Sequence, residues 1–407
     1  MKFPELLIPA GNLEKLRTAI LYGADAVYAG LEGLSLRASA AEFAMPDLAT
    51  GIAEAHRQGV RVYAALNIFA KNRDVERLRQ MLPVLGELKT DGVIISDPGV
   101  LRLVKQFLPG VPIHLSTQAN TTNAEAVRFW REQGVSRIVP ARELSLAEIA
   151  ALGRAVPDME LEIFGHGAMC VAYSGRCFLS AWRTGRSANA GECTQPCRWE
   201  YRLTESTRPN EPLLLEEDPQ YSYLLSSKDL CLIDQLPAVV NAGIASLKVE
   251  GRMKSPYYVA VVARTYRAAL DALRADPANY RCRPEWLDEL GKISNRGYTA
   301  GFYFRPDEKI TELSPDVKYF QTYDLAGTVL AYEPNAGRVL VGVRNRLSRE
   351  DQIELLLPDA TLALDPLEMT DLQGLPLPVA HNGYQVYLPV DREAPQGAVI
   401  RKKINGG

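Results

Sequence analysis

The N-terminal two thirds of the chain alternates short apolar runs with longer segments of helical spacing. The apolar runs occupy residues 6–9, 26–30, 62–67, 92–97, 113–117, 137–142, 161–166 and 247–252. Amphipathic segments lie between them, and Asn12 and Ser145 are candidate helix caps. Eight strands with intervening helices are typical of an α/β fold, the (β/α)8 TIM-like barrel. A doubly wound open sheet is the competing interpretation, because a sequence pattern does not show whether the sheet closes.

The spacing of the runs also predicts the domain organisation. The gap between the seventh and eighth runs is much longer than the others, and from about residue 319 short β runs alternate with turn residues. We therefore expect a barrel over residues 1–275 with an insertion at 168–228, just before the last strand. A helical connector over 276–318 and a small C-terminal β-barrel domain over 319–407 follow.

Strand parity predicts which side chains face the barrel axis. Successive strand residues point to opposite faces, and the apolar set should face the helices. The sets on the side opposite the apolar residues are Lys248, Glu250 and Arg252, then His114, Ser116 and Gln118, then Glu162, Phe164 and His166, all polar except Phe164. Polar residues at the carboxyl ends of barrel strands are where such enzymes carry their chemistry. The alternative is a buried ion network that satisfies itself.

Composition and charge narrow the class of protein. The 407 residues are 47% hydrophobic and carry a net charge of −3, so any contact with nucleic acid needs a local basic patch. We see no run of about 18 apolar residues and no secretory signal, so we expect a cytoplasmic protein without a membrane span. Clustered cysteines in that reducing compartment indicate a metal site or catalysis more often than disulfides.

Four of the six cysteines fall within 28 residues, and they carry the strongest chemical signal in the chain. They are Cys170, Cys177, Cys193 and Cys197, spaced C-x6-C-x15-C-x3-C. Four thiolates on an irregular insertion suit a [4Fe–4S] cluster. Structural zinc and inert thiols are the alternatives, although the C-x2-C pairs usual for zinc are missing. Cys231 follows SSKDL and is expected to approach the same end of the barrel, where it is a candidate to replace Cys197 as the fourth ligand or to be a nearby thiol.

Arginines and aromatic residues surround these cysteines. They are Arg176, Arg183, Arg186, Arg198 and Arg202, with Tyr173, Trp182, Trp199 and Tyr201, against only two acidic residues. Guanidinium groups interleaved with aromatic planes suit phosphates and unstacked bases. In the alternative interpretation the rings pack around the metal site and the arginines are merely solvated.

Common hydrolase signatures are missing from the sequence. There is no H-E-x-x-H, G-x-S-x-G, S-x-x-K or Walker-type loop. A lone histidine on a strand is usually a satisfied core residue. His166, at the end of a strand beside the insertion, is nevertheless a candidate for proton transfer.

Several long motifs resemble peptidase family U32. They are ELLIPAGN, GADAVYAGL, HLSTQAN, FGHGAMCVAYSGRC, GECTQPCRWEY, SSKDLC, SLKVEGRMKSPYYVA and RGYTAGF. That family includes collagenase-like peptidases and iron–sulfur proteins of oxygen-independent hydroxylation. The hydroxylation members act on the tRNA wobble uridine, a ribosomal RNA cytidine or a ubiquinone precursor. The segments SLRASAAEF, ARELSLAEI and CRWEY look most like the members that form 5-hydroxyuridine in tRNA, with prephenate as a linked metabolite.

The resemblance implies roles for individual residues. The four clustered cysteines match the family's cluster ligands, and some relatives recruit a later cysteine instead, which keeps Cys231 a candidate. We expect Glu250, His166 and Lys248 to be catalytic, with Glu250 or His166 moving protons. Arg37, Arg142 and Arg252, together with Lys248, are expected to hold a small carboxylate metabolite. Asn67 and Gln118 are expected to orient the base or metabolite.

The expected function is therefore hydroxylation of the wobble uridine in the tRNA anticodon stem-loop. A U32-type peptidase, hydroxylation of another substrate and a non-catalytic RNA-binding protein are the alternatives. The sequence does not give the oligomeric state.

Overall fold

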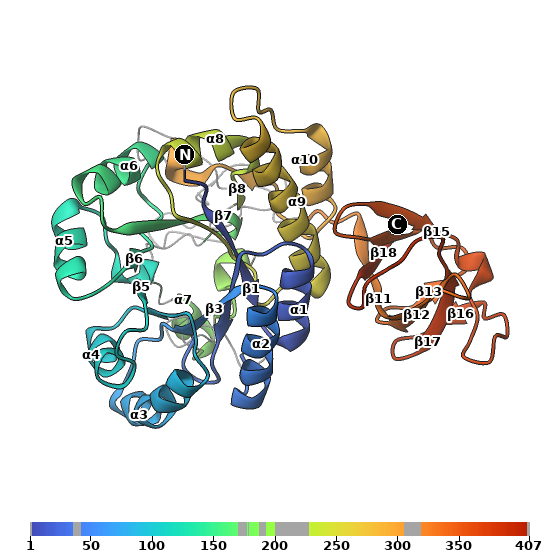
Figure 1. Cartoon of the computed structure of the whole chain (residues 1–407), viewed down its shortest axis with the longest axis horizontal. Coiled ribbons are helices and arrows are strands. Elements are labelled where there is room, and N and C mark those ends of the chain that lie inside the picture. Colours follow the sequence, from blue (N-terminus) through green and yellow to red (C-terminus); the bar gives the residue numbers. More distant parts are fainter. Residues whose placement is uncertain are drawn as a thin grey trace, which may run out of the picture.

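The computed structural model describes residues 2–35, 42–169, 177, 179–186, 193–199, 228–304 and 319–404. Within these ranges a barrel of parallel strands, surrounded by helices, lies beside a separate antiparallel β domain (Figure 1). No helix in the described ranges has both the length and the apolar character that crossing a membrane requires.

Eight parallel strands close the barrel. They are β1 (Glu5–Ala10), β2 (Ala26–Gly30), β3 (Arg61–Leu66), β4 (Gly92–Ile95), β5 (Ile113–Leu115), β6 (Arg137–Ile138), β7 (Glu160–Ala168) and β9 (Ser246–Val249). Each pairs in parallel with the next, and β9 pairs with both β1 and β7, which completes the ring. The predicted (β/α)8 barrel is confirmed, and the open sheet is wrong.

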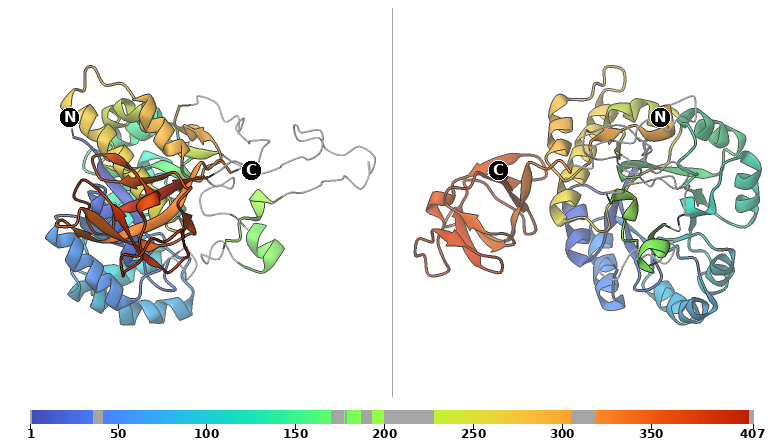
Figure 2. Two further views of the ribbon diagram at one scale, coloured as in Figure 1. Left: turned by 90° about the vertical axis from the view of Figure 1, so that its right-hand side faces the viewer. Right: turned by 180° about the vertical axis from the view of Figure 1, so that it is seen from behind.

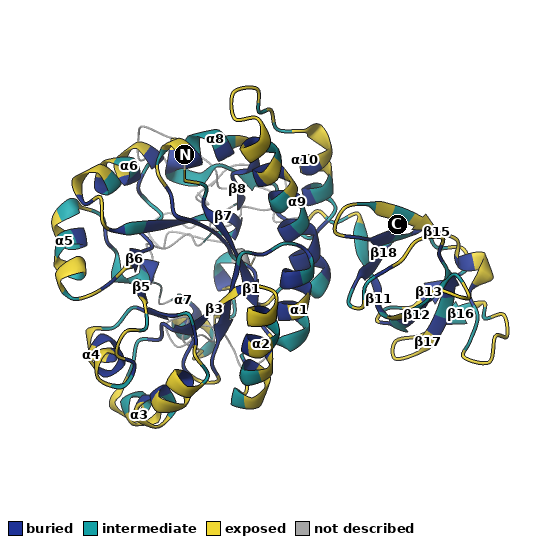
Figure 3. Ribbon diagram, in the orientation of Figure 1, coloured by how far each residue is buried: buried dark blue, intermediate teal, exposed yellow. Residues whose placement is uncertain are grey.

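Helices cover the outside of the ring. They are α1 (Leu13–Leu21), α2 (Met45–Arg57), α3 (Asn72–Glu87), α4 (Pro98–Phe107), α5 (Ala124–Glu132), α6 (Leu146–Ala155), α8 (Leu236–Asn241) and α9 (Pro256–Ala275). Asn12 caps α1 by accepting the Lys15 N–H at 2.9 Å, and Ser145 and Glu148 form a capping box on α6. The strands and the inner faces of these helices are buried, while the outer faces are exposed (Figure 3).

Two short strands extend the barrel sheet beyond the ring. β8 (Asp229–Cys231) runs antiparallel to the end of β7, and β10 (Tyr298–Thr299) pairs with β8. The short helix α7 (Leu179–Thr184) follows β7 in the chain and stands off one end of the barrel in the side view of Figure 2. The 3-10 turn η4 (Pro196–Arg198) lies in contact with α7. Neither extra strand was predicted.

The C-terminal domain is an antiparallel half-barrel. Its strands are β11 (Tyr323–Glu333), β12 (Arg338–Val343), β13 (Leu347–Ser348), β14 (Ile353–Leu356), β15 (Thr361–Leu364), β16 (Val379–Ala380), β17 (Gln385–Pro389) and β18 (Val399–Lys403). Six of them pair in the order β15-β14-β18-β11-β12-β17, while β13 and β16 form a separate pair. The predicted small C-terminal β domain is confirmed, and its sheet is a half-barrel, because β15 and β17 at the two ends of the six-stranded order are not paired with each other in the described ranges.

Buried contacts attach this domain to the barrel. The Tyr22 hydroxyl on α1 donates to the Leu356 carbonyl at 2.7 Å and accepts the Val399 N–H at 3.0 Å. Arg401 on β18 is fully buried and forms two hydrogen bonds, of 2.8 and 2.9 Å, with Glu289 on α10 (Pro284–Gly291). Leu356 and Val399 belong to the same apolar core as the barrel. The two domains therefore share a buried interface.

Candidate functional site

The amino-terminal half of the barrel interior contains a network of charged side chains, which we call the floor network. It joins three carboxylates to three cations, namely Glu5, Glu160, Glu162, Arg61, Arg137 and Lys248. Arg137 lies at its centre: its guanidinium is 2.7 Å from Glu160 and 3.3 Å from Glu162, and it also binds Glu5. Buried ions are costly unless each is paired, and the four buried members, Glu5, Glu162, Arg137 and Lys248, each have a partner of opposite charge. Arg61 and Glu160 lie at the solvent edge, where Lys2 also binds Glu160. Its arrangement indicates a structural role.

Lys248 is part of the floor network, although its strand position predicted chemistry. Its Nζ lies 2.8 Å from Oε1 of Glu162 and 4.5 Å from the centre of the Tyr28 ring. Burial by itself would raise the pKa of Glu162, but Lys248 and Arg137 outweigh burial and lower that pKa to about 2. The carboxylate is therefore charged at neutral pH and holds the ammonium. This geometry favours the self-satisfied ion network over the catalytic role expected of Lys248.

Glu250 and Arg252 lie just beyond the carboxyl end of β9, on the axial side that parity predicted. The Tyr28 hydroxyl lies 3.4 Å from Oε2 of Glu250 and donates to the Val249 carbonyl at 2.8 Å. The guanidinium of Arg252 lies over the same ring, 5.7 Å from its centre. A half-buried carboxylate and a stacked cation therefore share one wall of the barrel mouth.

Arg142 lies beyond the carboxyl end of β6, on another part of the mouth. Its guanidinium lies 5.9 Å from the centre of the Phe164 ring, and the Nζ of Lys248 lies 5.8 Å from that centre. The Phe164 ring thus lies near one cation of the mouth and one cation of the floor network. The structure brings Arg142, Arg252 and Glu250 to the same end of the barrel, as the sequence predicted. Arg37 lies outside the described residues.

Asn67, Ser116 and Gln118 form a polar triad at the ends of β3 and β5. Nδ2 of Asn67 donates to Oγ of Ser116 at 3.4 Å and to Oε1 of Gln118 at 3.3 Å, and Ser116 also donates to Gln118. Asn67 is only 8% exposed, and its Oδ1 is buried with no hydrogen-bond partner in the part of the chain that the structure describes. A buried acceptor without a donor costs about 1–3 kcal/mol, so this site would gain from a ligand that donates a hydrogen bond.

His166 is displaced from the axial set by a β-bulge. Phe164 pairs with Lys248 on β9, but His166 pairs with Val249, so the residue between them is extra. The bulged residue is Gly165, where a Cβ would lie 2.4 Å from Cδ1 of Leu247. The bulge reverses the alternation, and the prediction that His166 shares the side of Phe164 is wrong.

The His166 ring instead packs under α9, outside the ring of strands. Its Nδ1 lies 3.4 Å from the Tyr266 hydroxyl, and the rings of Tyr258 and Tyr298 lie against it. Burial lowers the pKa of His166 to about 3, so the imidazole is neutral at physiological pH. The geometry makes it a core histidine.

Cys231 lies on the same outer side. It is the cross-strand neighbour of His166, and its Sγ is 3.6 Å from the Tyr266 hydroxyl. Burial raises the pKa of Cys231 to about 11, so the free thiol is protonated at neutral pH. This environment argues against Cys231 as the substitute ligand.

The clustered cysteines are only partly described. Cys177, Cys193 and Cys197 are reduced, and Sγ of Cys193 accepts the Gln195 N–H at 3.4 Å. Cys170 lies outside the described residues. Among those that are described, no three Cys, His, Asp or Glu side chains gather as a metal site. The three described thiols do not form a cage by themselves, and the [4Fe–4S] cluster stays a prediction.

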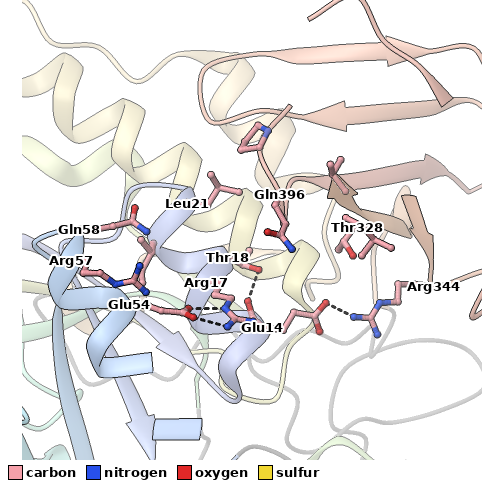
Figure 4. A pocket seen from close by; sticks show the side chains of 15 residues that line it. Glu14, Arg17, Thr18, Leu21, Glu54, Arg57, Gln58, Thr328, Arg344 and Gln396 are labelled. Atoms are coloured by element: carbon pink, nitrogen blue, oxygen red, sulfur yellow. Dashed lines mark hydrogen bonds and ion pairs between the residues drawn. The ribbon is translucent and has the colours of Figure 1, made fainter. Parts of the chain in front are cut away.

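A separate cleft of about 780 Å³ lies between the outer surface of α1 and α2 and the C-terminal domain (Figure 4). Charged residues that line it pair with one another: Arg17 makes two hydrogen bonds of 2.7 Å to Glu54, and Arg344 binds Glu14. No residue from the carboxyl end of a barrel strand lines it. We therefore assign the candidate site to the barrel mouth.

Comparison with known proteins identifies one family over nearly the whole chain. The model of "Peptidase family U32" matches residues 11–313, and that of "Peptidase family U32 C-terminal domain" matches residues 321–401. The "tRNA hydroxylation protein P1" of Bacillus subtilis is 40% identical over 98% of this chain and 95% of its own length. The "tRNA hydroxylation protein P" of Escherichia coli is 37% identical over 96% and 94%. The "Collagenase" of Porphyromonas gingivalis is 30% identical over 95% and 94%.

Proposed function

Because the chain belongs to peptidase family U32, we propose that it is an RNA-modifying enzyme that hydroxylates the wobble uridine of tRNA to 5-hydroxyuridine. The observation that carries this proposal is the similarity to two proteins named for tRNA hydroxylation, at 40% and 37% identity over both domains. The tRNA anticodon stem-loop is the proposed partner. Oxygen independence and a link to prephenate belong to the same proposal.

The polar triad of the mouth suits recognition of a pyrimidine. The unpartnered Oδ1 of Asn67 is an acceptor for the N3–H of uracil. Gln118 receives both triad hydrogen bonds through Oε1, which leaves its Nε2 to donate to a carbonyl of the base. An acceptor beside a donor matches the imide edge of uracil, and cytosine would require both amides to turn over.

Glu250 is the proposed group for moving a proton. Replacing the C5–H of uracil by a hydroxyl is a two-electron oxidation, in which a hydroxyl-donating co-substrate would supply the oxygen and accept the two electrons. The C5 proton is also released, and a carboxylate within reach of substrate can take it up. Glu250 is half-buried at the mouth beside the Tyr28 hydroxyl, whereas His166 lies behind the strands. Arg142 and Arg252 would hold the carboxylates of a metabolite such as prephenate by charge-assisted hydrogen bonds.

A [4Fe–4S] cluster is the proposed cofactor. Cys170, Cys177, Cys193 and Cys197 would hold it, because their spacing and thiol chemistry suit iron and the family resemblance matches all four. Such a cluster supplies electron transfer. Iron and sulfide analysis of anaerobically purified protein tests this: Cys193→Ser should lose both, and Cys282→Ser is the matched control outside the motif.

Deletion of the gene tests the function directly. Cells without it should lose 5-hydroxyuridine derivatives from tRNA, measured by nucleoside mass spectrometry, and a plasmid copy should restore them. An unchanged tRNA profile would reject the proposal. Loss of 5-hydroxycytidine from ribosomal RNA would instead indicate a ribosomal RNA cytidine as the substrate. Loss of ubiquinone would indicate a ubiquinone precursor.

A peptidase is the second candidate, since a relative of 30% identity is named "Collagenase". The structure brings one cysteine and one histidine together, Cys231 and His166. An active thiolate–imidazolium pair has a lowered cysteine pKa and a raised histidine pKa. Here burial raises the pKa of Cys231 to about 11 and lowers that of His166 to about 3, the reverse pattern. Peptide turnover that survives serine replacement of all four clustered cysteines would favour the peptidase.

A further inference from the structure

The helix α7 presents an unusually exposed indole. Trp182 is 74% exposed, more than any other large apolar side chain in the described ranges, and Trp199, just after η4, is 42% exposed. Tryptophan normally buries most of its large apolar surface. Two exposed indoles on one small unit therefore point to a partner that covers them.

Hydrogen bonds hold this unit together. Oγ of Ser180 lies 3.1 Å from Oγ1 of Thr194 and accepts the Thr194 N–H at 3.1 Å, which ties α7 to the segment before η4. The Thr184 hydroxyl donates to the Ser180 carbonyl at 2.8 Å and lies 3.3 Å from Oγ1 of Thr194. These hydrogen bonds fix the backbone that carries the indoles, so a base that stacks on them would bind at little cost in conformational entropy.

The charge of the unit is opposite to that of the whole protein. Residues 179–199 contain three arginines, Arg183, Arg186 and Arg198, against one acidic residue, Glu192, while the whole chain has a net charge of −3. The guanidinium of Arg183 lies over the Trp182 ring, 5.4 Å from its centre. This is the local basic patch that an overall acidic protein needs to approach a polyanion.

The position of the unit relates it to the candidate site. α7 follows β7 along the chain, and β7 ends at the barrel mouth; Figure 2 shows the helix standing off one end of the barrel. A partner lying on α7 would therefore be beside the mouth. An aromatic plane next to guanidinium groups is the arrangement that binds single-stranded RNA, because every base has a face to stack and every nucleotide a phosphate.

We propose that Trp182 and Trp199 stack unpaired bases of the RNA loop, while Arg183 and Arg186 neutralise the neighbouring phosphates. This platform holds the loop beside the mouth while one base enters the barrel. The inference rests on the proposed function, because it takes the partner to be the single-stranded anticodon loop.

Binding of a labelled anticodon stem-loop RNA to the full-length protein tests the platform. Trp182→Ala should weaken binding about 5- to 150-fold, the usual worth of one base–aromatic stack, and Trp182→Phe should restore most of it. Arg183→Ala with Arg186→Ala should lower the slope of log K against log salt by about 1.4, for two phosphates of a single strand. Phe129→Ala is the matched control, since Phe129 is 53% exposed on α5 of the outer wall.

The outcomes separate this inference from the proposed function. Wild-type protein that binds and modifies RNA, with unchanged affinity in Trp182→Ala, overturns the platform and leaves the function standing. Wild-type protein with no RNA binding rejects both. Equal weakening towards a blunt duplex without a loop overturns stacking. A loss of iron from Trp182→Ala that parallels the loss of binding also overturns it, because the ring would then pack around the metal site.

Discussion

Replacing Lys248 by methionine tests whether this lysine belongs to the floor network or to the chemistry. Methionine keeps much of the apolar stem but removes the ammonium that lies 2.8 Å from Glu162. Glu162 is fully buried, so its charge would lose one of its two cationic partners. Removing one partner of a buried ion pair costs about 3–5 kcal/mol. We expect the low end, about 3 kcal/mol, because Arg137 stays 3.3 Å away.

Urea unfolding of a double-mutant cycle measures this cost. Glu162→Gln alone should also destabilise, because it leaves the ammonium buried without its carboxylate. The double variant Lys248→Met with Glu162→Gln removes both charges, and it should recover at least about 2 kcal/mol of the summed losses. The double variant should also keep 5-hydroxyuridine in tRNA when it replaces the wild-type gene. Additive losses, or a stable Lys248→Met protein that has lost hydroxylation, would refute the structural role.

Three further variants test other parts of the structure. His166→Gln removes a group whose folded pKa, about 3, lies below its unfolded pKa of 6.5, so the wild-type protein loses stability as the pH falls from 6.5. Between pH 7 and pH 5 the free energy of unfolding in urea should therefore fall by about 2 kcal/mol less in the variant than in the wild type. An identical pH dependence would contradict the burial argument. Asn67→Leu removes the buried acceptor, so tRNA hydroxylation should fall at least about tenfold while unfolding free energy changes by less than about 1 kcal/mol; undiminished hydroxylation would exclude base recognition by this residue. Arg401→Met removes the guanidinium that binds Glu289 and Glu354, but the half-buried Glu289 keeps Lys292 as a partner. The variant should therefore cost about 2 kcal/mol in urea unfolding. A neutral change would show that the interdomain ion pair contributes little.

The barrel could be predicted because its signal is local. Each strand shows as a run of apolar residues followed by a helical segment, and all eight predicted runs overlap a strand of the ring. Parity was equally reliable on β9, where Leu247 and Val249 join the outer core and Lys248 faces inward over the Tyr28 ring. The extra strand β8 has three residues, too few for any period, and it exists only because it pairs with the end of β7.

The chemistry of single side chains was harder to predict, because it depends on contacts that are distant in sequence. Glu162 and Lys248 are 86 residues apart, and no local pattern pairs them. His166 was misplaced by one bulged residue, although Gly165 is a usable signal, since glycine within a strand often marks a bulge. The environment of Cys231 depends on Tyr266, a residue of a helix packed over the strands.

The two halves of the barrel interior differ in how completely their polar groups are satisfied, and this difference favours a modifying enzyme over a peptidase. The floor network pairs three carboxylates with three cations. At the mouth, by contrast, Asn67 keeps a buried acceptor without a described partner, and Glu250 is half-buried. Peptide hydrolysis needs an activated nucleophile or metal-bound water, and the neighbouring cysteine and histidine lie behind the strands with pKa values shifted the wrong way. Hydroxylation of a pyrimidine needs its edge to be held and a proton to be removed, and the mouth has side chains suited to both.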